Sequence, residues 1–494
     1  MEVKSGEFRK VAAATMTDPR LQEALDGVYT GFYKGRIVQA LTTDRWEEQR
    51  EQGRAIKAHV IENLDYYLGM FTENVEKNGG HVYFAANAAE AARYVVDLAK
   101  SRGVKTVIKS KSMVSEEMGL NNVLEAAGVE PVETDLGEYI IQLAREAPYH
   151  IIAPAIHKSK EQVADLLAPQ SGGQKVEEIA ALTRQAREQL RPVFQRADMG
   201  VTGVNFAVAE SGSVVIVTNE GNGRMATSAP RIHMACMGME KVIPSVRDLA
   251  LFLRILIRSA TGQRISNYVS MINGPRRPDE HDGPDEFHLV IVDNGRLRLL
   301  ADPALREALY CIRCGACMNA CPVYRKVGGH SYGWVYPGPI GAVVTPAMTG
   351  LKQAKDLPFA SSLCGACREA CPVKIDLPRM LLELRSQAVE GTAGNIKHQP
   401  EARNPEGPAE RLVWRAWRFG MGGRMRFDLG ARLARVALLP VARRGWLKKA
   451  PGPASGWTTS RDFPLPAARS FRSRFKRVKR AAARERTMGG GHGA

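Results

Sequence analysis

Seven of the chain's eight cysteines fall in two short runs, each ending in Cys-Pro. The first run reads Cys311-Ile-Arg-Cys314-Gly-Ala-Cys317-Met-Asn-Ala-Cys321-Pro322, which has the complete spacing of bacterial ferredoxins. The second reads Ser361-Ser-Leu-Cys364-Gly-Ala-Cys367-Arg-Glu-Ala-Cys371-Pro372, with serine in the first cysteine position. Each iron of a cubane cluster takes one thiolate ligand, and closely spaced cysteines let one tight loop supply three. The runs therefore predict iron–sulfur clusters and electron transfer.

Disulfide bonds and zinc are weaker explanations of the two runs. A disulfide framework requires an oxidising compartment, and seven clustered cysteines would leave one without a partner. Zinc ribbons usually contain C-x2-C pairs, without a third cysteine at the same spacing and a fourth before proline. The eighth cysteine, Cys236, stands alone between apolar residues and is expected to lie buried in a core.

The pairing rule of two-cluster proteins assigns the ligands, because the fourth cysteine of one run ligates the other cluster. One iron of cluster 2 is then left without a cysteine. Its ligand is the Ser361 oxygen, a water or a partner's side chain, or the cluster has only three irons. Serine alkoxide is harder and more basic than thiolate, which favours a labile or three-iron site. A further alternative keeps Ser361 as a loop residue beside a [4Fe-4S] cluster. The assigned ligands are Cys311, Cys314, Cys317 and Cys371 for cluster 1, and Cys321, Cys364 and Cys367 for cluster 2.

Charge is concentrated at one end of this 494-residue chain, whose length suggests about three domains. Residues 401–494 hold 22 Lys and Arg against 6 Asp and Glu, whereas the first 400 residues are nearly balanced at 47 against 46. A basic tail of this kind suits an acidic partner or an anionic membrane surface. No sequence-reading motif accompanies the charge, so no specific nucleic-acid partner is expected.

Residues 1–78 have a helical pattern, and an alternation of strands and helices follows over residues 79–298. Strands separated by helices imply an α/β domain with a parallel sheet covered on both faces. The expected strands are 81–86, 106–110, 130–135, 150–155, two within 205–218, 232–243, 268–272 and 287–293. The expected helices are 88–101, 121–127, 138–145, 160–167 and 246–259.

Residues 299–390 form the predicted cluster domain. Helices are expected at 302–310, with Pro303 near the start, and at 378–388. The 42 residues between Cys321 and Cys364 are too many for a compact ferredoxin of short hairpins, so an α-helical ferredoxin-like module is expected. Residues 391–410 read as a linker. The basic region 411–494 is expected to contain amphipathic helices at 411–419 and 433–439 and a disordered end from Met488.

Three further features of the sequence bear on function. Lys109 and Lys111 follow a predicted strand, where they would hold an anion or lie on a solvated turn. Glu210 stands at a strand end beside a glycine turn, in a place suited to chemistry or to a buried ion pair with Arg224. The spacing of the histidines His157, His281 and His288 indicates no metal site.

The N-terminus has no apolar signal region, and the longest helical apolar stretch contains Arg254 and is far shorter than a membrane span. Reduced thiolate motifs and the lack of an export signal favour the cytoplasm, with peripheral contact at the inner face of the membrane through the tail.

These motifs together resemble the lactate-utilisation protein B family. The resemblance covers roughly residues 30–450 and is carried by the segments 200–213 and 230–233 and by both cysteine runs through Ile375. Residues 455–494 match nothing in it.

The resemblance implies an iron–sulfur subunit of a three-protein bacterial system that oxidises L-lactate to pyruvate. Its implied partners are a cysteine-rich subunit and a second α/β-domain subunit. It also implies a sugar-isomerase or CoA-transferase type of fold for residues 79–298, and the seven-cysteine, two-cluster ligand set. The nucleophilic glutamate of CoA transferases is not carried over to Glu210, because Ala209-Glu-Ser-Gly matches that pattern poorly.

Two functions from different classes follow. The first is an electron-transfer subunit, because the chain has neither a nucleotide-binding glycine fingerprint nor a catalytic dyad of its own. The alternative is an α/β enzyme of acyl or sugar-phosphate type with structural clusters. Purified chain incubated with lactate and an artificial electron acceptor separates the two.

Overall fold

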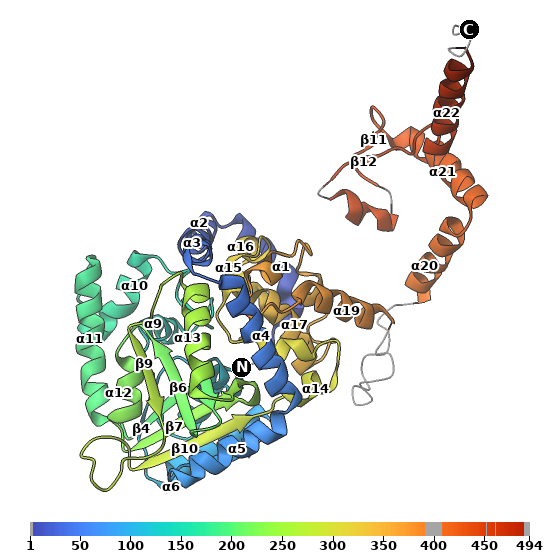
Figure 1. The fold of residues 1–494 in the computed structure, drawn as a ribbon. Helices are drawn as coiled ribbons and strands as arrows, with labels where there is room; N and C mark the ends of the chain where they lie inside the picture. Colours follow the sequence, from blue (N-terminus) through green and yellow to red (C-terminus); the bar gives the residue numbers. More distant parts are fainter. Residues whose placement is uncertain (1–2, 391–407, 451, 460, 489–494) are drawn as a thin grey trace. The chain divides into compact units, whose positions relative to one another are not determined.

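A computed structural model of the chain describes residues 3–390, 408–450, 452–459 and 461–488. The chain divides into two compact units, residues 1–404 and 405–494 (Figure 1). The first unit contains the α/β sheet and both cysteine runs, and the second contains the basic C-terminal helices.

Six parallel strands form the main sheet of the first unit, in the order β1-β10-β7-β4-β2-β3. Alternate side chains of β7 (Ile232–Gly238) enter two different cores, Met234 and Cys236 on one face and Ala235 and Met237 on the other. This arrangement confirms the expected parallel sheet buried on both faces, and the expected burial of Cys236. The other strands are β1 (His81–Ala85), β2 (Thr106–Lys109), β3 (Glu130–Glu133), β4 (Met199–Gly203) and β10 (Glu286–Val292).

Helices cover both faces of this sheet (Figure 1). One face packs against α6 (Ala88–Ser101), α7 (Met113–Met118) and α8 (Leu120–Ala126). In the core on the other face, α13 (Val246–Ala260) buries Leu249, Phe252 and Leu256 at helical spacing. The remaining helices of the α/β region are α9 (Leu136–Ala144), α10 (Lys160–Leu167), α11 (Ile179–Arg196) and α12 (Asn222–Ser228).

A second sheet lies in the same core as α13. Its order is β8-β5-β6-β9, and β5 pairs with β6 as the antiparallel hairpin expected from the sequence. The strands are β5 (Phe206–Val208), β6 (Ser213–Thr218), β8 (Val242–Ile243) and β9 (Tyr268–Ile272). The strand expected over 232–243 is therefore two strands in different sheets. The turn between them contains Glu240 and Lys241, both buried.

The N-terminal helices pack onto the cysteine-containing part of the chain. Ser5 donates a hydrogen bond to the Tyr332 carbonyl at 2.7 Å, and Arg325 pairs with Asp26 at 2.6 Å. The helices of this segment are α1 (Phe8–Thr17), α2 (Pro19–Val28), α3 (Lys34–Thr42), α4 (Trp46–Glu62) and α5 (Leu64–Lys77), with a π-helical turn over 29–33. Residues 5–77 are therefore mostly helical.

Short helices surround the two cysteine runs. They are α14 (Arg296–Ala301), α15 (Ala316–Asn319), α16 (Tyr324–Val327), α17 (Gly338–Thr349), α18 (Ala366–Ala370) and α19 (Leu377–Glu390). The glycine-rich segment between the runs supplies α17, which is buried along nearly its whole length. Helix α19 confirms the helix expected at 378–388.

Two expected elements are wrong. Residues 150–155 form an irregular loop because side chains use its backbone groups: the His150 Nδ1 accepts the N–H groups of Ile152 and Ala153, and Lys111 donates to the Ile152 carbonyl. The α-helix expected at 302–310 is a 3₁₀ turn over 306–310, because the Asp302 carboxylate accepts the N–H of Ala304 and forms a turn instead.

The second unit contains α20 (Pro408–Met421) and α21 (Arg424–Leu438), which confirm the two helices expected there. A two-stranded ribbon follows, β11 (Trp446–Leu447) with β12 (Phe463–Pro464), and then α22 (Phe471–Met488). Most of the expected linker 391–410 and the end 489–494 lie outside the described residues. Among the described residues, no helix is long and apolar enough to cross a membrane.

Candidate metal centre

The two cysteine runs form loops of the same shape. In the first, the Cys311 sulfur accepts the backbone N–H of Arg313 at 3.4 Å, and Arg313 has a positive φ of 60°. In the second, the Ser361 oxygen accepts the N–H of Leu363 at 3.1 Å, and Leu363 has a φ of 56°. A glycine of positive φ follows the next cysteine in both loops. The chain thus places the Ser361 side chain where the first loop has its leading sulfur.

Cys371 of the second run lies with the first run. Cys311, Cys314, Cys317 and Cys371 line one small cavity, which Ile340 and Ile375 close on its apolar side. Burial and the neighbouring thiols of Cys371 and Cys311 raise the pKa of Cys314.

Cys321 of the first run lies with the second run. Burial and the adjacent Cys321 thiol raise the pKa of Cys367 to about 12, with a further contribution from Cys364. Cys364 itself is exposed, and the backbone N–H of Ala366 lowers its pKa. This group of three therefore reaches the surface, whereas the thiols around Cys314 are largely enclosed.

The donor set fits iron–sulfur clusters. All seven thiols are free in the structure, and most are buried against one another. Ionised thiolates packed this closely without water require bound cations to offset their charge. Soft sulfur donors in loops of this spacing select iron–sulfur centres.

Two arginines of the N-terminal helices hold the end of the second run. Arg36 of α3 donates to the carbonyl oxygens of Ala370 and Glu369 at 3.0 and 3.1 Å. Arg50 of α4 donates to those of Cys371 and Glu369, both at 2.8 Å. These carbonyls end α18 and lack partners within the helix, so guanidinium groups satisfy them. The N-terminal segment thereby fixes the position of Cys371.

A buried ion-pair network joins the first run to the sheet. Arg296 makes two hydrogen bonds of 2.9 Å with Glu117 and one of 2.7 Å with Glu240. Arg313 donates to the second Glu240 oxygen at 3.2 Å and lies over the ring of Tyr336. Burial alone would raise the pKa of Glu240, but Arg296 and Arg313 hold it well below its ordinary value. The loop of the first run is thus tied to the turn after β7.

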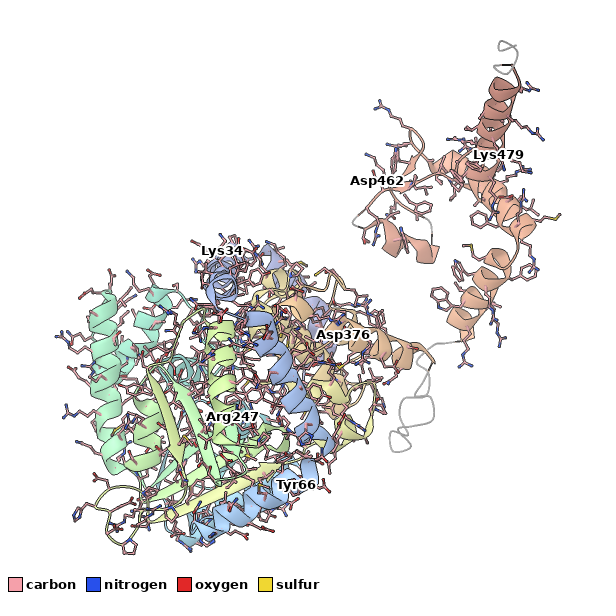
Figure 2. All side chains as sticks on the ribbon, in the orientation of Figure 1. Lys34, Tyr66, Arg247, Asp376, Asp462 and Lys479 are labelled. Atoms are coloured by element: carbon pink, nitrogen blue, oxygen red, sulfur yellow. The ribbon has the colours of Figure 1, made fainter. Side chains whose placement is uncertain are left out.

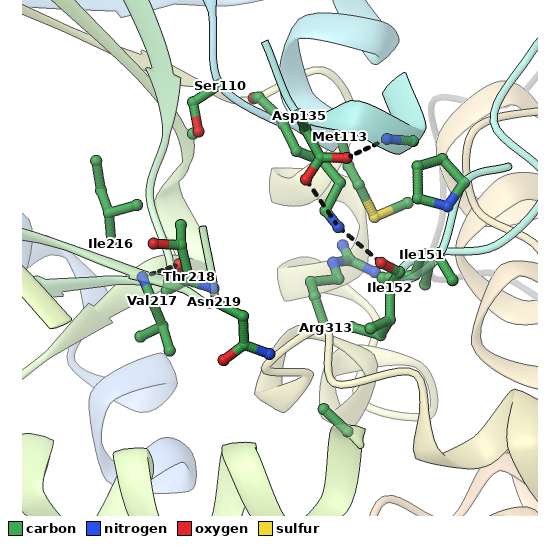
Figure 3. Close-up of a pocket in the computed structure, with 18 of the residues that line it drawn as sticks. Ser110, Met113, Asp135, Ile151, Ile152, Ile216, Val217, Thr218, Asn219 and Arg313 are labelled. Carbon is green, nitrogen blue, oxygen red and sulfur yellow. Dashed lines mark hydrogen bonds and ion pairs between the residues drawn. The ribbon is translucent and has the colours of Figure 1, made fainter. Parts of the chain in front are cut away.

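A cavity of about 620 Å³ lies beside this network, where segments following the carboxyl ends of β2, β3, β4 and β7 converge (Figure 3). Parallel sheets commonly bind ligands at this edge. Arg313 enters the cavity from the first cysteine run. The lining also includes Ser110, Lys111, Asp135, Ile152, Asn205, Ile216, Thr218, Glu220, Lys241 and Leu256.

Lys109, the last residue of β2, and Lys111, two residues later, have different surroundings. Lys109 is buried and contacts Glu133 at 2.5 Å, Asn121 at 2.6 Å and Glu116 at 3.3 Å. Burial would lower its pKa, but Glu133 and Glu116 raise it. Lys109 is therefore a structural ion-pair residue, and both alternatives considered for it are wrong. Lys111 lines the cavity.

Glu210 and Arg224 do not form the buried ion pair considered above. Glu210 is exposed and accepts the backbone N–H of Val246, the first residue of α13, at 2.6 Å. Arg224 is also exposed and lies over the ring of Tyr268. Glu210 thus acts as a cap, because a carboxylate is favourable at the amino end of a helix.

His157 lies in a cluster that the sequence spacing did not reveal. Its side chain, Glu146 and His330 have possible ligand atoms within 4.8 Å of one another. The Glu146 carboxylate is already paired, with His157 Nε2 at 2.8 Å and with Lys158. The lysine supplies the positive charge that a metal ion would bring, so we assign no metal there.

Comparison with known protein families matches three segments of the chain. A LUD domain model matches residues 68–292, a 4Fe-4S dicluster domain model residues 307–375, and a model of the lactate utilisation protein B C-terminal region residues 383–480. The last match corrects the expectation that the family resemblance excludes everything after residue 455.

Whole-chain comparison gives curated relatives named lactate utilization protein B. Those of Bacillus thuringiensis strain Al Hakam, Bacillus cereus strain AH187 and Bacillus anthracis strain A0248 are each 44% identical over 480 residues, covering 97% of this chain and 99% of theirs. A crystal structure of a DUF162 family protein from Deinococcus radiodurans aligns with 46% of this chain and 98% of its own, at 11% identity and a TM-score of 0.26. This chain belongs to the lactate utilization protein B family.

Proposed function

We propose that the chain is the electron-transfer subunit of a system that oxidises L-lactate to pyruvate, and that it carries two [4Fe-4S]-type clusters. Cluster 1 would be held by Cys311, Cys314, Cys317 and Cys371, and cluster 2 by Cys321, Cys364 and Cys367. The observation that carries the proposal is the exchange of one cysteine between the two groups, since each run contributes its last thiol to the other. That exchange is the pattern of two-cluster electron carriers.

The two cysteine groups differ in exposure, and this difference suggests which cluster exchanges electrons with a partner protein. Cys364 is exposed, so cluster 2 would face a protein partner, whereas cluster 1 would be enclosed beside the cavity. The partners we propose are a cysteine-rich subunit and a second α/β-domain subunit. Clusters held by free thiolates also suit a reducing compartment such as the cytoplasm.

The α/β region is proposed to share the sugar-isomerase and CoA-transferase type of fold. An acyl or sugar-phosphate enzyme is the competing function. It is disfavoured because Glu210, the residue that its strand-end position made a candidate for chemistry, caps a helix at the surface. The sheet in our proposal serves to bind a ligand and to support the clusters.

Anaerobic purification with iron and sulfide analysis tests the proposal. About seven to eight irons per chain are expected, with two spectroscopically distinct clusters after dithionite reduction. The isolated chain should not reduce an acceptor with lactate, and the chain combined with its partners should. Lactate oxidation by the isolated chain would favour the enzyme, and zinc in place of iron would exclude electron transfer.

A further inference from the structure

The cavity beside the first cysteine run has more positive charge at one end than its acidic groups offset. Lys241 and Arg313 both line it, and Arg313 shares the Glu240 carboxylate with Arg296. Arg296 is in turn paired with Glu117. Three cations therefore lie against two carboxylates.

Two of these cations have unused hydrogen-bonding capacity. The Arg313 side chain is only 10% exposed, and its Nη1 is buried without a hydrogen-bond partner. Lys241 is 8% exposed, and among the described residues its ammonium group has no hydrogen bond or ion pair. A buried guanidinium nitrogen without a partner is costly, so a ligand oxygen that accepts from Arg313 and lies near Lys241 would be favourable.

The acidic side chains of the cavity do not offset this excess. Asp135 lies 3.9 Å from Lys111, which also donates to the Ile152 carbonyl at 2.7 Å (Figure 3). Burial and the nearby Asp135 raise the pKa of Glu220, so a second negative charge is disfavoured there. The fourth cation of the lining, Lys158, is paired with Glu146 outside the cavity.

The rest of the lining suits an apolar body. Ile151, Ile152, Ile216, Leu256 and Ala260 line the cavity, and its volume of about 620 Å³ far exceeds that of a three-carbon acid. Cavities of about 300–1,000 Å³ with a few convergent polar groups bind cofactor-sized molecules. We propose that this cavity binds an organic anion larger than lactate, with its carboxylate or phosphate group on Lys241 and Arg313 and its apolar body along these side chains.

Ligand binding in this cavity would be a function separate from electron transfer. The bound ligand would lie beside the proposed cluster 1. The competing explanation is that Lys241 and Arg313 only neutralise the negative charge of that cluster. In that case the two residues would change the spectrum or potential of cluster 1 without binding any anion.

Calorimetry on the anaerobically purified, cluster-loaded chain distinguishes the two explanations. The probes are flavin mononucleotide, which carries a phosphate, and phenylpyruvate, which carries a carboxylate. Each has a control that lacks the acidic group, riboflavin and phenylacetone respectively. We expect saturable binding of at least one acidic probe and at least about tenfold weaker binding of its control, because charged hydrogen bonds are lost. Binding of flavin mononucleotide alone would indicate a phosphate ligand, and binding of phenylpyruvate alone would indicate a carboxylate ligand.

Three cavity variants and one control variant complete the experiment. Lys241→Met and Arg313→Gln should each weaken binding of the acidic probe by about tenfold or more. Arg368→Gln is the matched control, because Arg368 belongs to the second run and pairs with Asp376 at the surface. For a variant that folds poorly, Ser266→Glu in the half-buried cavity lining adds a repelling charge and should weaken binding.

Three outcomes overturn the inference: no binding of either acidic probe, equal binding of the controls, or unchanged binding in all three cavity variants. Iron analysis of the same samples keeps this result separate from the proposed function. A chain that binds the probe without holding two clusters refutes the electron-transfer role alone, and the reverse result refutes the ligand site alone.

Discussion

Ser361 holds the same position in the second cysteine loop that Cys311 holds in the first. Each side chain accepts the N–H of the residue two places ahead, and that residue has a positive φ of about 60° in both loops. The second loop is therefore folded as a cluster loop despite its serine. The Ser361 oxygen thus occupies the position from which a cysteine sulfur would bind one iron of the proposed cluster 2.

Replacing Ser361 with cysteine should complete the ligand set of cluster 2. Because thiolate is a softer ligand for iron than serine oxygen, we expect Ser361→Cys to retain iron longer against a chelator. Iron content should reach about eight per chain. Iron analysis and electron paramagnetic resonance of the oxidised protein check this, since any three-iron signal of the natural chain should disappear in the variant.

Ser101→Cys is the control, because Ser101 is an exposed serine outside both cysteine loops. It should change neither iron content nor the rate of iron loss. Equal behaviour of the two variants would show that position 361 is not a ligand position.

Cys371→Ser should damage cluster 1 although Cys371 belongs to the second run. Its thiol lies in the cavity formed with Cys311, Cys314 and Cys317. We expect loss of up to about four irons and of the cluster 1 signal. Cys321→Ser is the reciprocal variant and should damage cluster 2 instead. Resonance spectra of the two reduced variants check the crossing, and the opposite pattern would refute it.

Acidification below about pH 6.5 should weaken the contact between the α/β region and the first cysteine run. His150 Nε2 lies 2.8 Å from the Asn319 oxygen, and burial lowers the pKa of His150 to about 4. The unfolded chain takes up this proton near its ordinary pKa of about 6.5, so stability is full above that pH and falls until about pH 4. The expected loss is about 1 kcal/mol between pH 6.5 and 5.5, because the unfolded histidine is already half protonated at pH 6.5.

Unfolding midpoints measured at these two pH values check the effect. His150→Gln should reduce the pH dependence, because glutamine keeps polar groups without titrating. His281→Gln is the control, since His281 is exposed. A pH dependence that is identical in both variants would assign the effect to other groups.

Removal of residues 469–494 should leave both clusters intact and weaken binding to anionic surfaces. The segment holds nine Lys and Arg against one Glu, and the exposed Phe471, Phe475 and Val478 form an apolar stripe on α22. Figure 2 shows Lys479 and the other side chains of this helix projecting around it. The cut is placed after β12, because an earlier one would break its pairing with β11.

Sedimentation with vesicles that contain an anionic lipid measures this binding. The difference between full and shortened chains should shrink as salt rises toward 0.1 M, where the Debye length is about 10 Å. Vesicles of neutral lipid are the control. Loss of iron on truncation would show that α22 supports the clusters, and unchanged binding at low salt would show that it does not contact such surfaces.

The spacing of the cysteines and the strand–helix alternation were readable from the sequence because both are local patterns. Cys314 and Cys317 must serve one loop since only a few residues separate them. Likewise, the apolar runs of β7 and β10 predict strands buried on both faces, whatever their neighbours are.

Contacts between side chains and backbone groups that lie far apart in the sequence could be seen only in the tertiary structure. The loop 150–155 has the composition of a strand, but His150 and Lys111 use its backbone groups. The chain turns between two sheets at Glu240 and Lys241, which no local pattern marks.

The cavity depends on the same kind of long-range placement. Lys241 follows β7, Arg313 belongs to a cysteine loop about 70 residues later, and α13 lies between them in the chain. Composition and residue spacing indicate which secondary structure a short segment prefers. Buried charges are stable only where hydrogen-bonding or ion-pair partners surround them. Those partners come from distant parts of the chain, so they meet only when the whole first unit has folded.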